Sequence, residues 1–594
     1  MSELDVRALF SSCGPILVAF AAVGLLFADQ LTEKQLTAGS SDNQVQGEKI
    51  SPDGKYLALA DNANGLSLLQ IDTRKTRAFP NTLSMYPLGW LRAGQELLLR
   101  PGGKAEVWKM SLSEGIPRKF VDGVADAWPS PDGMGIAFVK AGLPNEIWLM
   151  GANGEGPRRI TSTDSLNSYS EVDWSPNGRR ILYTLRVDAG SSWTYRIESC
   201  DVEHGECSLI LEDPKLMAPG TGGTAITWLP DNRVIFSRGD PPPHDRDTNL
   251  WSVAVDQTTG RVLEQPHRMT SWAGYSLDWL SHSADGKRLV MSRTSEQNAV
   301  RLVAVNSGPA GVVNGAGAEN SQNFVGGWTR DSKAIVLAFY RDGVWSIDKP
   351  TVGRDAVSTT HLAKSNLWPL VTHSSSFPAP VATPDGKWVL YRESARDGTF
   401  RLVRLRTDGG SPSILLTRSS PFGYACSTSN ACFFEETRDG QIIFSDLDPV
   451  DGLRSEIERV NVPKGFLAKL DRPWWSPSPD GGSIAIVGAS QDKDAIQIVS
   501  VKRGAVRELR VKLASGMQSV GWAADGNSLF VTDSDWDAVK SRLLRVSLSG
   551  ASEIVTEISL TLGWLNSLVA SPDGRYIAFN ERRWRTDVLM IENF

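Results

Sequence analysis

Histidine and cysteine are scarce in this chain. It contains six histidines and five cysteines among 594 residues, and the histidines are spread along the chain without the spacing of a ligand cluster. The sequence also lacks a Gly-x-Ser-x-Gly elbow, a His-Glu-x-x-His motif and a phosphate-binding glycine loop. We therefore predict no catalytic residue, no metal site and no cofactor.

An excess of positive charge is also missing. Lys and Arg total 62 against 68 for Asp and Glu, so the formal net charge is −6. Proteins that bind nucleic acid neutralise its phosphates with clustered basic residues, so we expect no nucleic-acid partner. The apolar content of 41% is too high for a disordered chain, and the length allows several hydrophobic cores.

One long apolar run is present, at the N-terminus. Residues 8–28 read ALFSSCGPILVAFAAVGLLFA, about 20 residues without a charge, which is about enough helix to cross a bilayer. We expect residues 1–30 to form a hydrophobic helix that anchors the chain in a membrane, because both the positive segment and the small-residue cleavage site of a signal peptide are weak. The alternative is a cleaved export signal, which would release the rest of the chain to the periplasm.

The rest of the chain is built from a repeated unit. A Ser-Pro-Asp-Gly turn, or a variant of it, is followed by a short alternating apolar strand. Two of the gaps between copies are double length, and each contains a degenerate copy, at residues 90–94 and 424–434. Twelve units result, with a mean spacing of about 47 residues. The third turn residue of the ten clear copies is Asp53, Asp132, Asn177, Asp231, Asp285, Asp331, Asp385, Asp480, Asp525 and Asp573.

The unit predicts the fold. Each unit contains four short segments that can pair as antiparallel strands, which is the make-up of a propeller blade. One ring commonly holds four to eight blades, so twelve units predict an all-β fold with two tandem β-propellers of about six four-stranded blades each. The stretch 306–322 is rich in Gly and small polar residues, which favours a first propeller at 31–315 and a second at 316–594. A division into seven and five blades stays open.

The two ends of the repeat region are incomplete. The last unit ends after its third strand, at residues 588–593, and residues 34–37 resemble a fourth strand without a unit of its own. We predict that these segments pair and close a ring, because an open ring would expose strand edges.

Tryptophan often precedes the turn. A large flat side chain at this place can wedge between neighbouring blades, so we interpret these residues as packing residues and not as a ligand platform. They are Trp90, Trp128, Trp174, Trp228, Trp328 and Trp522.

The repeat resembles a known family. The Ser-Pro-Asp-Gly turn followed by Ile-Ala-Phe-like strands, over residues 35–594, is similar to the WD-repeat-like propellers of the TolB type, found in TolB and in tricorn-like and prolyl-oligopeptidase-like peptidases. Residues 36–73 look like the extracytoplasmic portion of bacterial membrane-anchored regulators and kinases. The resemblance implies a sensor-like propeller outside the cytoplasm. Those relatives carry a winged-helix or kinase domain before the membrane segment, and here residues 1–7 precede it, which puts a signalling output in doubt.

Four cysteines form two local pairs. Cys200 and Cys207 lie between two predicted strands, and Cys426 and Cys432 straddle the turn of the unit that lost its Pro-Asp-Gly. The separations place each pair across a hairpin, with a two-residue turn in the first case and a three-residue loop in the second. We predict two disulfides and hence an oxidising compartment; four free thiols are the alternative. Cys13 lies in the apolar run.

One insertion is a candidate binding loop. Residues 240–247, DPPPHDRD, lengthen the turn between the second and third strands of the fifth blade. Three prolines stiffen this loop, and its tip offers the polar residues His244, Asp245, Arg246 and Asp247, which could gate the mouth of a central channel. A tolerated surface loop is the alternative.

These observations favour a non-catalytic protein. We expect an extracytoplasmic, membrane-anchored double propeller that recognises a protein, peptide or glycan on its loop-rich face. The alternatives are a propeller-type lyase or hydrolase with its site in a central channel, and a scaffold without a small-molecule site. Histidines and carboxylates clustered on a channel wall would favour the enzyme, and a bare or hydrophobic rim would favour protein binding.

Overall fold

The computed structural model describes the chain from residue 31 to its end, with short gaps. The predicted hydrophobic helix at residues 1–30 lies outside the described residues, and the described part contains no helix that is both long enough and apolar enough to span a membrane. The internal gaps are 38–44, 62–63, 143–144, 165–166, 189–192, 217–224, 242–246, 306–307, 313–321, 342–343, 353–358, 366–378, 396–398, 430, 462–473, 488–493, 503–504, 514–516, 536–539 and 560–563.

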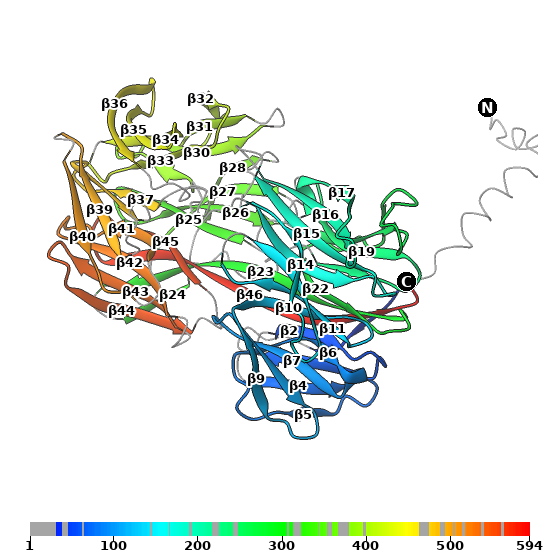
Figure 1. Cartoon of the computed structure of the whole chain (residues 1–594). Helices are drawn as coiled ribbons and strands as arrows, with labels where there is room; N and C mark the ends of the chain where they lie inside the picture. The colour runs from blue at the N-terminus through cyan, green and yellow to red at the C-terminus, as the bar shows by residue number, and fades with distance from the viewer. Residues whose placement is uncertain are drawn as a thin grey trace, which may run out of the picture.

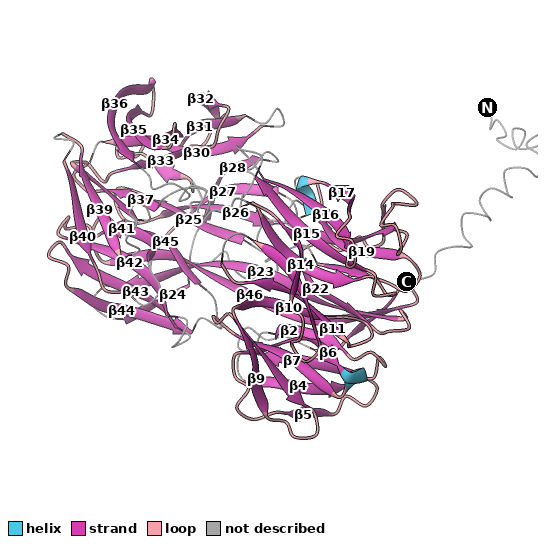
Figure 2. Ribbon diagram, viewed as in Figure 1, coloured by secondary structure: helices cyan, strands magenta, loops and turns pink. Residues whose placement is uncertain are grey.

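Strands make up almost the whole described chain (Figure 2). Helical turns within the described ranges are limited to two short 3-10 segments, η1 (Arg92–Gly94) and η2 (Pro214–Leu216). Nine sheets have four strands each, joined in sequence order as antiparallel meanders, and a tenth sheet has ten strands. The predicted all-β fold of two tandem β-propellers is confirmed.

The first ring has six blades. Its innermost strands contact one another around a common axis, and the last contacts the first. Five of its blades are simple meanders that span residues 45–78, 85–122, 124–162, 168–212 and 226–268. The six innermost strands are β2 (Val45–Ile50), β6 (Met85–Leu91), β10 (Val124–Pro129), β14 (Ser168–Trp174), β18 (Ile226–Trp228) and β22 (Ser276–His282).

The second ring also has six blades, which decides between the two divisions that the sequence left open. Four of its blades are separate four-stranded sheets that span residues 381–418, 423–461, 474–510 and 517–559, and a fifth, at 322–365, is a meander that belongs to the ten-stranded sheet. The innermost strands again contact one another in a closed series. They are β25 (Gln322–Trp328), β29 (Val381–Ala382), β33 (Gly423–Cys426), β37 (Trp474–Pro477), β41 (Met517–Trp522) and β45 (Trp564–Ala570).

Two long strands belong to both rings (Figure 1). β23 (Arg288–Ala304) and β46 (Tyr576–Glu592) pair antiparallel over all 17 residues. At one end they lie between β22 and β1 (Thr32–Gln35) and complete the first ring. At the other end they lie between β45 and β24 (Gly308–Val312) and complete the second ring.

The predicted pairing of the chain ends is confirmed. Lys34 lies opposite Met590, and Gln35 lies opposite Leu589. The end of β46 therefore lies in the first ring, whereas a simple division of the sequence assigns it to the second. The boundary predicted near residue 315 falls in a stretch outside the described residues and stays a prediction.

Repeated tryptophans join neighbouring blades. Trp90 donates its indole N–H to the backbone oxygen of Lys49 at 3.1 Å, and Trp174 donates to the backbone oxygen of Trp128 at the same distance. In the second ring Trp522 donates to Ser476 at 3.0 Å. Each indole donates to the innermost strand of the preceding blade, and all three tryptophan side chains are buried. Both observations support the interpretation of these tryptophans as packing residues.

The Ser-Pro-Asp-Gly turn is a hydrogen-bonded unit. In the first copy the Ser51 hydroxyl donates to Asp53 at 2.6 Å and accepts the backbone N–H of Tyr56 at 2.9 Å, while Asp53 also accepts the N–H of Lys55. Gly54 has a φ of 72°, which L side chains rarely adopt. The same bonds form at Asp285, where the hydroxyl and backbone donors lower the pKa of the carboxyl. Serine and aspartate thus hold the turn jointly.

The shared ribbon leads to a test of ring closure. Ile591 on β46 is fully buried in a core that includes Leu277 and Leu289 of the first ring. Ile591→Ala should cost about 2–5 kcal/mol of stability and loosen the first ring, although the residue is almost the last in the chain. Hydrogen exchange should show faster exchange in β2 and β22.

The matched control is Leu529→Ala, which removes a fully buried side chain from a core of the second ring. It should increase exchange in the blades around β41 instead. Equal loosening of both rings by Ile591→Ala, or loosening of the second ring alone, would contradict this assignment of the C-terminal strand.

Candidate functional site

The candidate binding loop is described only at its base. His244, Asp245 and Arg246 lie outside the described residues, so their role at the tip stays a prediction. Asp247 is buried, and its carboxylate accepts the backbone N–H of Gly274 at 2.8 Å. Asp247 therefore holds the loop base and is not part of an exposed polar tip.

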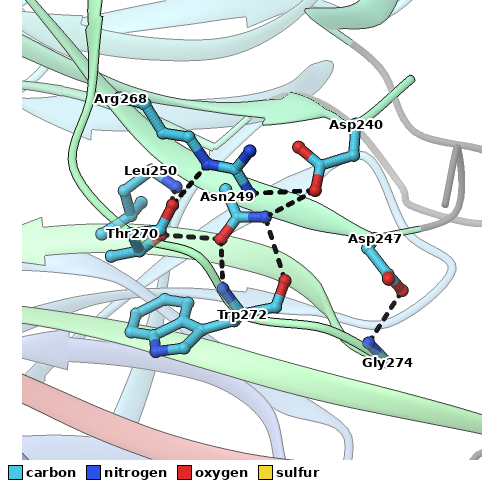
Figure 3. A network of polar contacts seen from close by, with 8 residues as sticks. All are labelled: Asp240, Asp247, Asn249, Leu250, Arg268, Thr270, Trp272 and Gly274. Carbon is cyan, nitrogen blue, oxygen red and sulfur yellow. Dashed lines mark hydrogen bonds and ion pairs between the residues drawn. The ribbon is translucent and has the colours of Figure 1, made fainter. Parts of the chain in front are cut away.

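A polar network fastens this base to the segment that leads into the next blade (Figure 3). Asn249 is completely buried, and its side-chain oxygen accepts the N–H of Trp272 at 2.6 Å and the hydroxyl of Thr270 at 2.9 Å. Its amide group donates to Asp240 at 3.1 Å, and Arg268 pairs with the same Asp240 oxygen at 2.9 Å. Every group in this network has a partner within the chain, so we interpret it as structural.

The two predicted cysteine pairs are disulfides in the structure. Cys200 and Cys207 lie opposite each other at the end of a hairpin, and Cys426 and Cys432 do the same. The first loop spans residues 202–205, so it is longer than the two-residue turn that we expected. It closes through a hydrogen bond from the N–H of Gly205 to the backbone oxygen of Asp201, at 2.9 Å.

The second disulfide stands beside a substitute turn. Ser427 accepts the backbone N–H of Ala431 at 3.1 Å, and its hydroxyl is 2.9 Å from that of Ser429. These two serines take the places that serine and aspartate occupy in the other copies. The turn chemistry is therefore retained in part next to the bridge.

Carboxylates gather around the axis of the first ring. A β-bulge interrupts the pairing of each innermost strand concerned. The bulges lie between Val45 and Gly47 in β2, between Val124 and Asp126 in β10, between Tyr169 and Val172 in β14, and between Asp278 and Ser281 in β22. Bulges redirect side chains and are frequent beside functional sites. We call Glu48, Asp126, Glu171 and Asp278 the axial cluster.

Burial dominates the electrostatics of the axial cluster. It raises the pKa of Glu171 to about 7 and that of Asp278 to about 7, and it holds the pKa of Glu48 well above the usual range. Glu48 also senses the negative charges of Glu171 and Asp278. Glu48 is fully buried, and its carboxylate accepts the hydroxyl of Ser292 on β23 at 2.7 Å.

Two cations accompany the axial cluster. Arg100 forms an ion pair with Asp126 at 2.8 Å and also donates to the backbone oxygen of Ala125. Lys49 counteracts the effect of burial on Glu48 and Glu171. Among the residues that the structure describes, no group of three His, Cys, Asp or Glu side chains is placed to hold a metal ion.

A histidine stands near the same axis. The Thr227 hydroxyl donates to Asp173 at 2.7 Å, so the Nδ1–H of His282 donates to Thr227 over 2.8 Å. Burial lowers the pKa of His282, which keeps the imidazole neutral near pH 7. Asp173 also accepts the backbone N–H of Trp228 at 2.9 Å, so this chain of bonds ties blades four, five and six together.

The second ring has a cavity of about 230 Å³ on its axis. All six innermost strands contribute to its wall, which contains small, hydroxyl, aliphatic and aromatic residues. No carboxylate or histidine is among the described residues that line it, and Arg330 carries the charge at its rim. Half-buried Trp474 and Trp475 are among its aromatic residues.

The two axes differ at equivalent positions. The bulges of the second ring contain Gly326 and Gly327 in β25, and Ser567 and Leu568 in β45. In the first ring Glu171 lies within the bulge of β14, and Asp126 and Asp278 flank the bulges of β10 and β22. A Cβ on Gly326 would lie 1.9 Å from the backbone oxygen of Pro380, so the strands approach too closely for a larger residue. Sequence reasoning missed this contrast, although the charged residues shortly before the turns of the first half were a signal for it.

Comparisons with known proteins give distant structural likeness only. No family model and no curated protein matches the chain. A tricorn protease structure shares 11% identity at a TM-score of 0.30 and covers 90% of this chain, which spans 59% of that protein. A GH74 enzyme of Niastella koreensis shares 12% identity at 0.32, over 90% of both chains. A nidogen/laminin complex shares 11% at 0.28, over 37% of this chain and 78% of that chain.

The raised pKa values lead to a test of the axial cluster. A folded-state pKa of about 7 for Glu171 exceeds the value near 4 of an unfolded carboxyl, so the folded chain binds more protons between these pH values. Stability should therefore fall as the pH rises from about 4 to about 7. At pH 8 Glu171→Gln should increase the free energy of unfolding by about 2 kcal/mol and so raise the unfolding temperature. At pH 4 it should leave the unfolding temperature nearly unchanged.

The control is Glu553→Gln, which makes the same chemical change at an exposed residue on β44 (Ser552–Ser559), away from the axis. It should leave the unfolding temperature unchanged at both pH 4 and pH 8. A Glu171→Gln effect of equal size at pH 4 and pH 8 would show that the carboxyl titrates normally and that it does not lie in a desolvated cluster.

Proposed function

We propose that this chain is a non-catalytic binding protein that recognises a protein, peptide or glycan segment at the axis of the second ring. The observation that carries this proposal is the cavity there, which is lined by small, hydroxyl and aromatic side chains and by no carboxylate or histidine among the described residues. Such a wall offers apolar contact and a few hydrogen bonds, which is the usual make-up of a recognition pocket.

The size of the cavity limits the ligand. A volume of about 230 Å³ is below the range of about 300–1,000 Å³ that holds a drug-sized molecule. The cavity therefore suits one large side chain, a loop tip or a sugar ring, with the remainder of the ligand resting on the turns around the rim. Turn residues of the second ring, among them Pro384, Pro479 and Pro572, line the cavity, so it lies at the end of this ring that carries the Ser-Pro-Asp-Gly turns.

An enzyme remains the second candidate, and the first ring favours it. A general acid works best when its pKa lies near the working pH, and burial raises the pKa of Glu171 and Asp278 to about 7. A lyase or hydrolase reaction at this axis would be lost in Glu171→Gln and would be unaffected by changes in the second ring. Turnover of glycan or peptide substrates by the purified protein would decide in its favour.

The location outside the cytoplasm is part of the proposal. Two disulfides in local hairpins support an oxidising compartment, because such bonds rarely persist in the cytosol. We propose a membrane-anchored protein whose propellers face the periplasm or the extracellular space, held by the apolar run at 8–28, or a secreted form after cleavage of that run. The TolB-type resemblance agrees with this location and itself stays a proposal.

A rim substitution tests the binding site. Thr428 is exposed and lines the cavity, so Thr428→Arg adds bulk there and a second positive charge besides that of Arg330. Binding partners selected on peptide and glycan arrays with the purified protein should bind Thr428→Arg at least tenfold more weakly. The control is Ser552→Arg, an exposed site on β44 that is not part of the cavity wall.

Both variants should unfold at the temperature of the unchanged protein, so that a loss of binding reports on the cavity. Selected partners that bind both variants equally well would refute the second ring as the recognition site. Arrays that yield no specific partner, together with turnover of a substrate, would support the enzyme instead.

A further inference from the structure

The mouth of the second-ring cavity is built from one position of the repeated turn. This position is the second residue of the turn, which is proline in the Ser-Pro-Asp-Gly copies. In the second ring the second turn residue of all six blades lines the cavity, so six equivalent positions surround its mouth. They are Arg330, Pro384, Thr428, Pro479, Ala524 and Pro572.

Arg330 differs from the other five mouth residues because it carries a charge. It is exposed, and its guanidinium forms no hydrogen bond or ion pair with any other residue that the structure describes. The arginine at the corresponding turn position of the first ring, Arg92, has an acidic partner in Glu96 at 3.6 Å. The mouth of the second ring therefore offers one cation whose N–H donors are available to a ligand.

The aspartates of the second-ring turns do not neutralise Arg330. None of them is among the described residues that line the cavity, and each accepts the backbone N–H two residues further along its own turn. Three of them also form an ion pair within their blade. The pairs are Asp385–Lys387, Asp525–Arg545 and Asp573–Arg575. The mouth is thus complementary to a negatively charged group.

The aromatic residues of the wall have few polar atoms left for a ligand. The indole N–H groups of Trp328 and Trp522 and the hydroxyl of Tyr424 each donate to a backbone oxygen of the chain, at 3.0–3.1 Å. The indole N–H of Trp474 is buried and therefore out of a ligand's reach. A concave wall with this aromatic surface favours a large apolar side chain as the anchor of the ligand.

Most hydroxyls of the wall are engaged or buried as well. Thr383 and Ser571 donate to the aspartates of their own turns, and Thr428 donates to the backbone oxygen of Pro479. The hydroxyl of Ser519 is buried. A sugar ring carries several hydroxyl groups, and each of them needs a partner when it leaves water. The wall therefore favours a peptide side chain over a sugar.

We infer that the second-ring cavity binds a peptide segment that places a large apolar side chain in the cavity and an aspartate or glutamate beside Arg330. The inference rests on the function proposed above and narrows the ligand from a protein, peptide or glycan to an acidic and apolar peptide motif. A guanidinium pairs with a carboxylate through two parallel hydrogen bonds, so Arg330 selects the acid while the cavity holds the apolar anchor.

The charge at the mouth contributes selectivity more than affinity. Ion pairs between exposed groups change an affinity by up to about fivefold, because water and side-chain entropy offset much of the attraction. Salt screens such pairs, whereas it does not weaken the burial of an apolar side chain. The preference for an acidic peptide should therefore disappear at high salt while the binding itself persists.

Selection from a random heptapeptide display library on the purified full chain tests the motif. Selected peptides should carry an aspartate or glutamate within two positions of a leucine, phenylalanine or tryptophan. They are then synthesised with both ends blocked, beside counterparts in which the corresponding amide replaces each acid. Isothermal titration calorimetry at low salt should show that the acidic form binds about three- to fivefold more tightly than the amide form.

Charge variants assign the preference to the mouth. Arg330→Gln should bind the acidic and the amide form equally, and Arg330→Glu should prefer the amide form. The matched control is Arg92→Gln, which makes the same change at the corresponding turn position of the first ring and should keep the preference. Unfolding temperatures establish that each variant is folded.

A neutral substitution locates the anchor. Ala524→Trp adds bulk without charge at the mouth and should weaken binding of both peptide forms at least tenfold. Its control is Ala284→Trp, at the corresponding turn position of the first ring, which should weaken neither form.

The outcomes separate this inference from the proposed function. Acidic and amide forms that bind equally, and that Ala524→Trp weakens equally, would overturn the acidic motif and leave the cavity as the recognition site. Selected peptides whose binding Ala524→Trp leaves unchanged would overturn both. A library that yields no peptide, with saturable binding of trigalacturonic acid that Ala524→Trp abolishes, would replace the peptide by an acidic glycan and so overturn the inference alone.

Discussion

The antiparallel pairing of β23 with β46 is the interaction on which the rest of the structure depends. A ring of sheets is stable only when its last sheet is complete, because an unpaired edge leaves backbone N–H and C=O groups without partners. Both rings obtain their missing strands from this one pair, which runs without interruption over 17 residues on each strand. Neither ring is therefore closed by a continuous segment of sequence, and each depends on the other half of the chain.

This closure also determines how the rings relate to each other. A flexible linker would let two propellers move independently, whereas here two continuous strands leave one ring and enter the other. A change in the angle between the rings would have to bend or break a hydrogen-bonded ladder. The ion pair between Arg288 and Glu592 at 2.9 Å holds one end of that ladder within the first ring.

The same scaffold carries two different axes. The innermost strands of the first ring carry acidic residues within or beside their bulges, whereas two bulges of the second ring contain glycine, or serine and leucine. Burial raises the pKa of Glu171 and Asp278 at the first axis, and the second axis is a cavity whose described wall contains Arg330 and no carboxylate or histidine. The two axes thus differ because of residues at a few positions on the innermost strands. The turns, the tryptophan hydrogen bonds and the order of the blades are alike in both rings.

The sequence by itself determined the local features. The repeated turn with Ser51 and Asp53, the alternating strands, the twelve units, the paired cysteines and the pairing of the chain ends could all be predicted, because each depends on residues close together or on a periodic pattern. The axial cluster and the shared ribbon were decided only by the tertiary structure. Glu48, Glu171 and Asp278 are far apart in sequence, and only closure of the ring turns them toward one desolvated space where their charges interact.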